Sequence, residues 1–487
     1  MIPLRQFILE AYPGYSVSSF PDISVNGLEC DSRKVQKGFV FIAVKGKKLD
    51  GDAFIQEAVS KGAVAIVSED TTPAKDFSLP WILVRDSRDA VLRLSQVFYA
   101  NPSKDLKIVG VTGTNGKTTT TYLLEHLLLK KGLRPGVIGT VNYRYAGKEI
   151  PAAETTPGPL QLQRIFSEMK QAHCSHALME VSSHALDQNR TGGVHFSAAI
   201  FTNLTRDHLD YHVTMENYFE AKSKLFSGLS EETSAIINHD DEWGMKLASK
   251  TLAKKWTFGL KDGADFQAVN LRYAHDGAGF ELKFEGKKIA VHLPLIGAHN
   301  VYNALGAIAA FYSLGFSVGE ACAFLSDFKG VPGRLESVRA GQDFAVVVDF
   351  AHTPDGLENV LRSLKNHPNG KLILVFGCGG DRDRAKRPQM ASIAAKYADR
   401  IFVTSDNPRS EDPKAIAAEI CGGFPQDFKK YAVVIDRRKA IRQALLEART
   451  GDMVLLAGKG HERSQIIGNE SIPFSDREEV ERVLVGR

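Results

Sequence analysis

The stretch that decides the fold runs Ile108-Val-Gly-Val-Thr-Gly-Thr-Asn-Gly-Lys-Thr-Thr119. An apolar strand pattern at Lys107–Val111 leads into a glycine-rich turn, and a helical pattern at Lys117–Lys131 follows until Gly132. Glycines let the backbone turn tightly, so its N–H groups and the positive end of the next helix face a phosphate together. Strand, turn and helix therefore predict a nucleotide triphosphate site within an α/β domain.

The loop departs from the strict P-loop pattern, because Val111 stands where that pattern has a glycine, five residues before Gly116. Lys117 and Thr118 nevertheless stand where a lysine reaches the β- and γ-phosphates and a hydroxyl ligates Mg²⁺. The loop alone does not distinguish a kinase, an ATPase or a ligase. The ATP contacts expected within it are Gly113, Thr114, Asn115, Gly116, Lys117, Thr118 and Thr119.

The composition argues against several classes of protein. Hydrophobic residues make up 43% and charged residues 24% of the chain, as in ordinary soluble proteins. The net charge of +4 is not gathered into a basic tail, which disfavours nucleic acid as a partner. The five cysteines are scattered without a C-x-x-C pair, which disfavours a disulfide framework or structural zinc. No secretory pattern or membrane-length apolar run occurs, so we expect a cytoplasmic monomer without a membrane partner.

The length of 487 residues exceeds what one hydrophobic core supports, so about three domains are expected. Breaks near residues 100–104 and 331–333 suggest domains at 1–100, 101–330 and 331–487. Strand patterns alternate with helical ones, which predicts three α/β units. These are a small N-terminal unit, a central mostly parallel sheet with helices on both faces, and a C-terminal Rossmann-like unit. Residues 266–295 alternate apolar and polar side chains instead, which predicts antiparallel strands.

Two clusters of polar side chains follow expected central strands. Glu180 closes the apolar run Ala177–Val181, and the carboxyl ends of parallel strands open onto the ligand crevice, so a carboxylate there is suited to holding Mg²⁺. Arg206–His212 gathers charged and imidazole groups after the next strand. Either His208 or His212 is a candidate for metal or phosphate binding.

Two further central features have an ordinary structural interpretation beside a functional one. Lys222 lies on a helical pattern, where a lone lysine is usually solvated. His299 and Asn300 open the helical pattern Val301–Tyr312, where they are suited equally to capping the helix and to contacting a nucleotide.

The third region carries polar clusters after each of four expected strands, at Asp349–Asp355, Gly377–Asp383, Asp406–Arg409 and Gly458–Glu462. Parallel strands bring their carboxyl ends to one edge of the sheet, so we expect these clusters to meet there and form a site. Arg382 and Arg409 are suited to binding a carboxylate through two hydrogen bonds, which predicts an acidic small molecule as ligand.

In this order, the clusters resemble the Mur ligases of bacterial cell-wall synthesis, and within that family the branch that adds the third peptide residue. The resemblance covers essentially the whole chain and rests on Asp31–Arg33, Gly113–Thr119, Glu154–Thr156, Glu180–His184, Arg206–His212, Gly297–Asn303, Asp349–Asp355, Gly379–Asp383, Asp406–Arg409 and Gly458–Glu462. It implies one domain each for a UDP-sugar, ATP and an incoming amino acid. It also implies a role in peptidoglycan precursor synthesis, and hence in cell shape and division.

The resemblance implies a two-step reaction in which a carboxylate attacks the γ-phosphate and an amine then attacks the acyl phosphate. The substrates it implies are UDP-N-acetylmuramoyl-L-alanyl-D-glutamate, meso-2,6-diaminopimelate and ATP, with Mg²⁺ at two sites. Positioning and charge neutralisation would supply most of the catalysis.

By position, the resemblance assigns a role to each of the following residues. Catalysis falls to Lys117, Glu180, His208 and Lys222, and the metal ligands are Thr118, Glu180, His208 and Lys222. Lys222 serves as a carbamate (N6-carboxylysine), which reverses its interpretation as a solvated residue. Asn300, Arg334 and Asp349 are assigned to the surroundings of the nucleotide. The UDP-muramoyl dipeptide is held by Ser32, Thr155, Thr156, Ser182, Gln188 and Arg190. The amino acid is held by Arg382, Asp406, Asn407, Pro408, Arg409, Gly458 and Glu462.

Arg409 bears on the choice of amino acid. Diaminopimelate carries a carboxylate at its far end and lysine does not, and lysine-adding relatives replace this arginine, so its presence implies diaminopimelate. Two positions depart from the family pattern. Phe350 stands where a tyrosine is more usual, and Glu154 stands where many relatives have a neutral amide. A carboxylate beside an anionic substrate needs a partner or an outward orientation.

Three alternatives remain at the level of sequence. The first is a neighbouring ligase of the superfamily, one that adds L-lysine or another amino acid or that makes folate polyglutamates. The cluster Asp406–Arg409 argues against it. The second is a P-loop kinase or ATPase, which leaves Arg382 and Arg409 unused. The third is a nucleotide-binding module without activity, which leaves Glu180 and Lys222 without a role.

Overall fold

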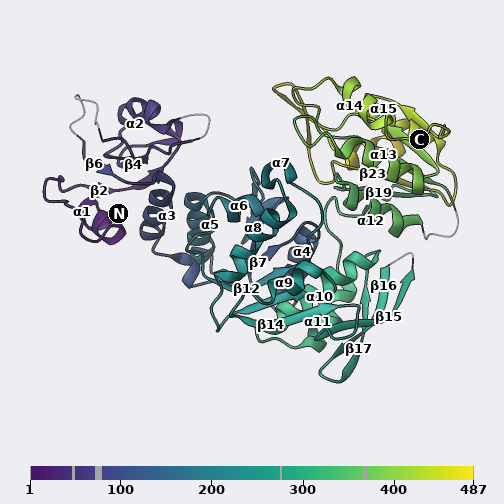
Figure 1. The fold of residues 1–487 in the computed structure, drawn as a ribbon, viewed down its shortest axis with the longest axis horizontal. Helices are drawn as coiled ribbons and strands as arrows, with labels where there is room; N and C mark the ends of the chain where they lie inside the picture. Colours follow the sequence, from purple (N-terminus) through teal and green to yellow (C-terminus); the bar gives the residue numbers. More distant parts are fainter. Residues whose placement is uncertain (1, 47–49, 72–78, 275–276, 366–369, 486–487) are drawn as a thin grey trace.

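The computed structural model describes residues 2–46, 50–71, 79–274, 277–365 and 370–485. Three units, each built on its own main sheet, follow one another along the chain (Figure 1). The N-terminal unit lies at one end of the long axis, the central unit in the middle, and the C-terminal unit beside the far part of the central one (Figure 1). The expected three-domain α/β architecture is therefore confirmed.

The N-terminal unit is a four-stranded parallel sheet in the order β3-β4-β5-β6. Its strands are β3 (Gly27–Glu29), β4 (Phe39–Ile42), β5 (Ala65–Ser68) and β6 (Trp81–Leu83), and its helices are α1 (Leu4–Ala11), α2 (Ile55–Ser60) and α3 (Ser87–Phe98). A two-stranded ribbon pairs β1 (Ile2–Pro3) with β2 (Ser24–Val25). The side chain of Tyr99, after α3, accepts a hydrogen bond from Arg164 of the central unit at 3.1 Å, and α3 lies beside α5 (Figure 1).

The central sheet has eleven strands in the order β10-β9-β8-β11-β7-β12-β13-β14-β15-β16-β17. Its parallel part comprises β8 (Pro135–Ile138), β11 (His176–Glu180), β7 (Lys107–Thr112), β12 (Phe196–Phe201), β13 (Ser234–Asn238) and β14 (Lys254–Gly259). Val109 and Val111 of β7 enter one hydrophobic core and Ile108 enters the other. A strand buried on both faces reads as a continuous apolar run, which is why β7 was recognisable from sequence.

Helices cover both faces of the central sheet, as predicted. The helices α4 (Lys117–Lys130), α10 (Ala298–Ser313) and α11 (Val318–Phe324) pack on one face, and α5 (Pro159–Gln171) and α8 (Met215–Ser227) on the other. Shorter helices are α6 (Ser183–Asp187), α7 (Leu209–His212) and α9 (Glu242–Leu247).

Antiparallel pairs extend the central sheet at both edges, and on one side they begin after β15, which itself pairs in parallel with β14. The expected excursion is confirmed as β15 (Phe266–Ala274), β16 (Gly277–Phe284) and β17 (Lys287–Leu293). The turn at Glu285-Gly286 has positive φ angles of 46° and 73°, whereas the other expected turn includes residue 276 and so lies partly outside the described residues. The hairpin β9 (Asn142–Tyr145) and β10 (Lys148–Pro151) at the opposite edge had not been predicted.

The C-terminal sheet has the order β18-β19-β23-β20-β21-β22, and all strands except β18 (Glu336–Ser337) run parallel. The parallel strands are β19 (Ala345–Asp349), β23 (Met453–Ala457), β20 (Leu372–Phe376), β21 (Arg400–Val403) and β22 (Tyr431–Val433). The helices α12 (Pro354–Lys365), α13 (Lys386–Tyr397) and α14 (Pro413–Cys421) cover one face, and α15 (Arg437–Glu447) and α16 (Asp476–Val485) the other. The prediction of a doubly wound unit is confirmed. Strand β22 and the hairpin formed by β24 (Ser464–Ile467) and β25 (Glu470–Pro473) had not been predicted.

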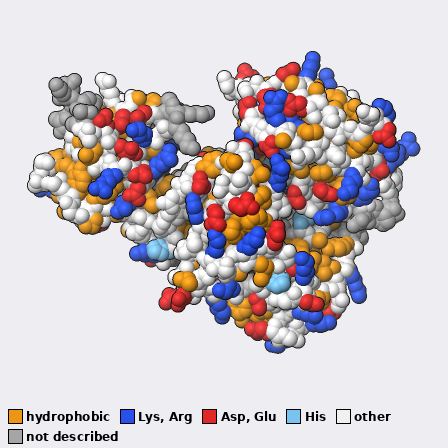
Figure 2. Space-filling view, in the orientation of Figure 1, with side chains coloured by type: hydrophobic (Ala, Val, Ile, Leu, Met, Phe, Trp, Pro, Cys, Tyr) orange, Lys and Arg blue, Asp and Glu red, His pale blue; other side chains and the backbone are white. Residues whose placement is uncertain are grey.

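Figure 2 shows basic and acidic side chains interspersed over the visible face of all three units. Within the described residues, no helix is long and apolar enough to cross a membrane.

Candidate active site

The glycines of the phosphate loop are required by close approach of neighbouring side chains. Gly113 has a φ of 147°, and a Cβ there would lie 1.9 Å from Thr202 Oγ1. Gly116 has a φ of 86°, and a Cβ there would lie 2.2 Å from Asn303 Oδ1. A side chain at either position would displace the side chain of Thr202 or Asn303 and would also be strained at these positive φ angles, so both positions favour glycine.

Two lysines converge on the carbonyl of Gly113. Lys117 Nζ donates to Gly113 O and Thr114 O, both at 2.9 Å, and Lys222 Nζ donates to Gly113 O at 2.9 Å. Burial lowers the pKa of both lysines, and the Lys117 charge lowers that of Lys222 further. Among the described residues, neither lysine forms an ion pair within 4 Å. Both amines therefore rest on main-chain carbonyls without a carboxylate partner, as suits a polyanionic ligand.

Lys222 is 1% exposed, so its interpretation as a solvated helix residue is wrong. The helix α8 lies against the central sheet, and the Lys222 ammonium sits 4.6 Å from the centre of the Tyr218 ring. The Tyr218 hydroxyl in turn lies 3.2 Å from Thr114 Oγ1 of the phosphate loop. Only the packing of α8, which its own sequence does not reveal, places this amine beside the loop.

Glu180 and Thr118 form a group of oxygen atoms at the carboxyl edge of the sheet. Thr118 Oγ1 donates to Glu180 Oε2 at 3.0 Å, and Glu180 is 1% exposed. Thr140, after β8, orients the carboxylate through its backbone N–H at 3.0 Å and its hydroxyl at 2.9 Å. Oxygen atoms of this kind are the ligands that Mg²⁺ prefers. The ion usually takes one or two ligands from the protein and completes its shell with phosphate and water. Accordingly, no described cluster of three or more acidic, histidine or cysteine side chains forms a metal cage.

His208 is the N-cap residue of α7 and has a left-handed φ of 54°. Its Nε2 lies 3.4 Å from Asp207 Oδ2, and its ring centre is 4.9 Å from that of His184. Burial lowers the pKa of His208 to about 4, so the imidazole is neutral near pH 7. His212, the other candidate, is engaged internally, because its Nε2 lies 2.9 Å from Ser183 Oγ.

Five of the six residues expected to bind the muramoyl peptide lie together beside Glu180. Thr155 Oγ1 is 3.1 Å from Thr140 Oγ1, and Thr156 Oγ1 accepts from Ser182 N at 3.0 Å. Arg190 connects the rest of the group, since its Nη1 donates to Thr156 O at 3.0 Å and its Nε to Gln188 Oε1 at 2.9 Å.

The sixth of these residues and the unusual carboxylate have different surroundings. Ser32 lies in the N-terminal unit, where its hydroxyl donates to Glu57 Oε2 at 2.5 Å, and no described hydrogen bond joins it to the other five. Glu154 forms an ion pair with Arg190. The acidic side chain that departs from the family pattern is therefore neutralised by a partner.

The three residues expected to surround the nucleotide differ in what they contact. Arg334 Nη2 donates to Thr118 Oγ1 at 3.3 Å, and its guanidinium lies 4.7 Å from the centre of the Phe350 ring. No described residue accepts a hydrogen bond from Arg334 Nε, which is buried. Asp349 instead accepts backbone N–H groups of Leu335 and Ala351, both at 2.7 Å, so it fixes the chain beside Arg334. Burial raises the pKa of Asp349.

Asn300 supports the loop indirectly. Its Nδ2 donates to Ile296 O at 2.9 Å, and its Oδ1 accepts from Asn303, the residue that closes over Gly116. Gly297 is the N-cap of α10, and no side chain caps this helix, so the capping interpretation of His299 and Asn300 is wrong.

The four C-terminal clusters meet at one sheet edge, as predicted, because β19, β23, β20 and β21 are neighbouring parallel strands. Arg409 Nη1 donates to Gly380 O at 2.9 Å and Arg382 Nη1 to Asp381 O at 2.9 Å. Burial lowers the pKa of Arg409, and the charge of Arg382 lowers it further. In the described part of the chain neither arginine is within 4 Å of a carboxylate, so both remain available for an anionic ligand.

The other expected amino-acid ligands surround these arginines. Asn407 Nδ2 donates to Glu462 Oε2 at 2.8 Å, and Asp406 Oδ1 accepts from Asn407 N at 2.7 Å. Gly458 has a φ of 114°, and a Cβ there would lie 2.5 Å from Asp406 Oδ2. Pro408 contributes its backbone, since a Cβ at Gly380 would lie 1.9 Å from Pro408 O.

Three residues near the site had received no role from the sequence, although Asp355 and Lys459 lie within two of the predicted clusters. Thr140 follows β8, a strand that the sequence had not predicted, so its strand-end position gave no signal. Asp355 accepts from Asn115 Nδ2 at 2.7 Å and so connects the C-terminal unit to the phosphate loop. Lys459 is fully buried next to Asn407. Its position between two glycines at a strand end was the signal that could have found it.

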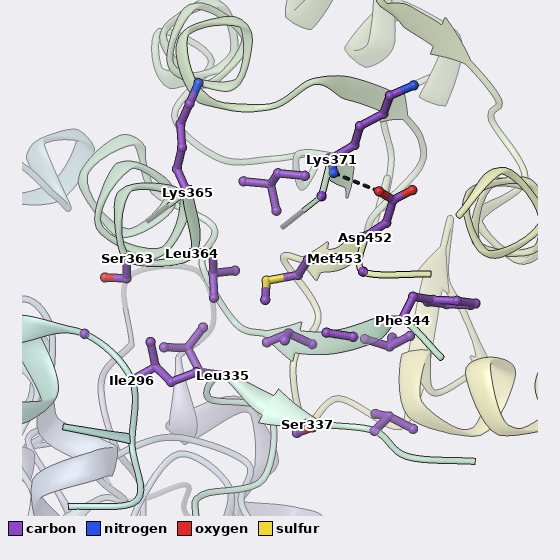
Figure 3. A pocket seen from close by; sticks show the side chains of 18 of the residues that line it. Ile296, Leu335, Ser337, Phe344, Ser363, Leu364, Lys365, Lys371, Asp452 and Met453 are labelled. Carbon is purple, nitrogen blue, oxygen red and sulfur yellow. Dashed lines mark hydrogen bonds between the residues drawn. The ribbon is translucent and has the colours of Figure 1, made fainter. Parts of the chain in front are cut away.

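A cavity of about 1340 Å³ lies between the start of α10 and the opposite, amino edge of the C-terminal sheet (Figure 3). Ile296, Leu335, Leu364 and Met453 line its apolar part, and the side chain of Lys365 points away from these residues (Figure 3). None of the residues that the sequence assigned to substrate, nucleotide or metal lines this cavity. The candidate active site therefore lies outside this cavity.

The fold and the phosphate loop together define an α/β protein of the nucleotide-binding P-loop type. Three regions match domains of one family. Residues 24–99 match the Mur ligase family catalytic domain, 111–311 the Mur ligase middle domain, and 333–460 the Mur ligase glutamate ligase domain. The chain belongs to the Mur ligase family.

Relatives of known name extend over the whole chain. The UDP-N-acetylmuramoyl-L-alanyl-D-glutamate–2,6-diaminopimelate ligase of Listeria innocua is 46% identical over 479 residues, which cover 97% of this chain and 96% of that protein. The protein of the same name from Gloeobacter violaceus is 44% identical over 488 residues, covering 100% and 99%.

Solved structures agree with these relatives. A structure of a ligase of that same name superimposes with a TM-score of 0.69 at 35% identity and 98% coverage of both chains. A MurF ligase from Thermotoga maritima in complex with ADP superimposes with a TM-score of 0.67 at 22% identity, covering 96% of this chain and 99% of that one. At that identity the second likeness concerns the fold alone.

Proposed function

We propose that this protein uses ATP to join meso-2,6-diaminopimelate to UDP-N-acetylmuramoyl-L-alanyl-D-glutamate. A carboxylate oxygen of the dipeptide attacks the γ-phosphorus, the bond to the β–γ bridging oxygen breaks, and ADP leaves. The diaminopimelate nitrogen then attacks the acyl carbon, phosphate leaves, and the amine loses a proton. The observation that carries the proposal is the pair Arg409 and Arg382, free of carboxylates, at the sheet edge that also holds Asp406 and Glu462.

The phosphate loop supports the first step. Lys117 and the loop N–H groups neutralise the charge of the phosphates, and Asn300, Arg334 and Asp349 keep the loop and its neighbours in place. Bound at Thr118 and Glu180, Mg²⁺ would neutralise charge on the transferring phosphoryl group. Neutral His208 lies where it can accept a hydrogen bond or ligate metal.

Lys222 supports a second metal position. Because burial favours its neutral amine, the nitrogen can attack CO₂, forming an N–C bond and losing a proton, which yields a carbamate. The carbamate gives this position a negative charge. The change suits a buried site beside Lys117, where two ammonium groups repel each other.

The amino-acid site supports diaminopimelate over lysine. The Arg409 guanidinium matches the far carboxylate of diaminopimelate, whereas lysine brings an ammonium to the same place. The group at Thr155, Thr156, Ser182, Gln188 and Arg190 holds the dipeptide beside Glu180 in this proposal, and Ser32 contacts the UDP-sugar from the N-terminal unit.

The test is phosphate release from ATP with each combination of the UDP-muramoyl dipeptide and a set of amino acids. We expect release only when the dipeptide and meso-diaminopimelate are both present, with kcat/KM for L-lysine lower by at least about 100-fold. Comparable rates with L-lysine would contradict the specificity, and release without the dipeptide would favour the kinase or ATPase alternative.

A further inference from the structure

Lys459 lies at the centre of the amino-acid site although no ligand is assigned to it. It follows β23 and Gly458, and its side chain is fully buried. Its Nζ donates to Glu462 Oε2 at 2.7 Å and to Asn407 Oδ1 at 3.0 Å. A buried ammonium persists only where acceptors satisfy it, so the fold maintains this cation for those two partners.

The ammonium sets the direction of the Asn407 amide. Asn407 Oδ1 accepts from Lys459 Nζ and from Ile466 N, both at 3.0 Å. Both of these groups are donors only, so the amide oxygen must face them and the Nδ2 must face Glu462. The flipped amide would place N–H groups against two donors.

The same arrangement fixes which oxygen of Glu462 remains open. Lys459 Nζ and Asn407 Nδ2 both donate to Oε2, at 2.7 and 2.8 Å. No described residue donates a hydrogen bond to Oε1. A carboxylate with one satisfied and one open oxygen is suited to accept a hydrogen bond from a ligand ammonium.

The network also reaches Arg409 through the strand β24. Ile466, whose N–H donates to Asn407, accepts from Arg409 N at 3.1 Å through its carbonyl. Arg409 has a left-handed φ of 52°, a conformation that a non-glycine residue keeps only when its surroundings hold it. Lys459, Asn407 and β24 therefore form one continuous support for the arginine.

We propose that Lys459 is a positioning residue that determines the affinity for the incoming amino acid. It aims Asn407 and Glu462 so that Glu462 Oε1 meets the ammonium at the far end of diaminopimelate, while Arg409 meets the carboxylate there. This inference rests on the proposed function, because it names a residue that sets the recognition of that substrate. It assigns no contact between Lys459 and the substrate itself.

The test compares Lys459→Met, which keeps length and loses charge, with Lys459→Arg, which keeps charge. Lys414→Met, an exposed lysine on α14 of the same unit, is the matched control. We expect Lys459→Met to raise KM for diaminopimelate by about 10- to 100-fold, as for loss of a charged hydrogen bond. The KM values for ATP and for the dipeptide should change by less than about 2-fold, and Lys459→Arg should recover part of the loss. Equal rises for all three substrates, or no recovery with arginine, would overturn the proposal.

A double-mutant cycle keeps the proposal testable if Lys459→Met folds poorly. In the Glu462→Gln background the half-buried carboxylate that pairs with Lys459 is gone, so the added Lys459→Met should raise KM by less than about 3-fold further. Additive effects of the two substitutions would refute a role through Glu462. Failure of the proposed function has a different signature, because wild-type protein would then release no phosphate in response to diaminopimelate.

Discussion

The phosphate loop and the C-terminal strand-end loops occupy equivalent places, at the carboxyl ends of parallel strands, yet basic side chains in the two regions have different kinds of partner. Lys117 and Lys222 rest on main-chain carbonyls. Lys459 is held by Glu462, and the fully buried Arg387 is held by Glu411 and Glu419.

The difference shows two ways of preparing a binding site. Carbonyls orient a cation and leave its charge uncompensated, so the phosphate loop is completed by a ligand that brings negative charge. Internal ion pairs compensate the charge before any ligand arrives, so the C-terminal loops are rigid and leave only selected donors open. The first site favours any polyanion of the right shape, and the second distinguishes between amino acids.

The largest effect expected from this comparison is at Lys222. Lys222→Ala should lower kcat by about 10³-fold or more, because it removes the group that we propose becomes an anionic metal ligand. Short carboxylic acids should restore part of the rate by placing an anion in the space. The measurement is phosphate release with and without added acetate or propionate.

Lys224→Ala is the matched control for that experiment. Lys224 lies two residues further along α8, is exposed, and pairs with Asp187 at 3.0 Å. This variant should retain nearly full activity. Full activity in Lys222→Ala as well would remove the carbamate from the proposal.

The next effect concerns the selective site. Arg409→Ala should raise KM for diaminopimelate by about 10- to 100-fold and leave KM for ATP within about 2-fold, because a charge-assisted hydrogen-bond pair is lost. Arg442→Ala, at an exposed position on α15, serves as control. Equal changes for both substrates would show that the two sites are not separate in function.

A smaller effect tests the contact that joins the two regions. Asp355 Oδ2 accepts from Asn115 Nδ2 at 2.7 Å and from Thr205 Oγ1 at 3.2 Å. Asp355→Ala should lower kcat/KM for ATP by about 5- to 10-fold, since it releases the Asn115 side chain of the phosphate loop. Glu358→Ala on the same helix removes bonds within the C-terminal unit, to Tyr397 and Lys396, and should be near neutral. Similar values for both variants would mean that the contact does not support the loop.

The smallest expected effect concerns the stability of the central sheet and not the chemistry at its carboxyl edge. Burial lowers the pKa of His176, at the amino end of β11, to about 4. Between about pH 6.5 and pH 4, His176 is therefore protonated in the unfolded chain but not in the folded one. The free energy of unfolding falls as the pH falls through that window.

The corresponding variant is His176→Gln. The free energy of unfolding falls between pH 7 and pH 5, and we expect this fall to be about 1 kcal/mol smaller in the variant than in the wild type. Urea titrations at the two pH values measure this, and His292→Gln, at an exposed position on β17, is the control. An identical pH dependence in His176→Gln and wild type would show that another group causes the acid sensitivity.

Much of the fold could be predicted because buried parallel strands leave a strong signal. The runs Lys107–Val111, Ala345–Asp349 and Met453–Ala457 are apolar on both faces and were recognisable as strands. Short or polar strands were not, as β9 and β25 show, because their stability comes from pairing with a neighbour. The missed strand β8 also concealed Thr140, which orients Glu180.

The sequence by itself determined the phosphate loop, the longer buried strands and the polar side chains that follow several of them, because these features depend on residues close together in the chain. Tertiary structure alone decided which cations are buried and what satisfies them. Lys222 lies 109 positions from Gly113, and Lys459 lies 52 from Asn407. Packing of α8 and pairing of β20 with both β21 and β23 bring these atoms within 3 Å, and the surrounding acceptors then fix the direction of each lysine side chain.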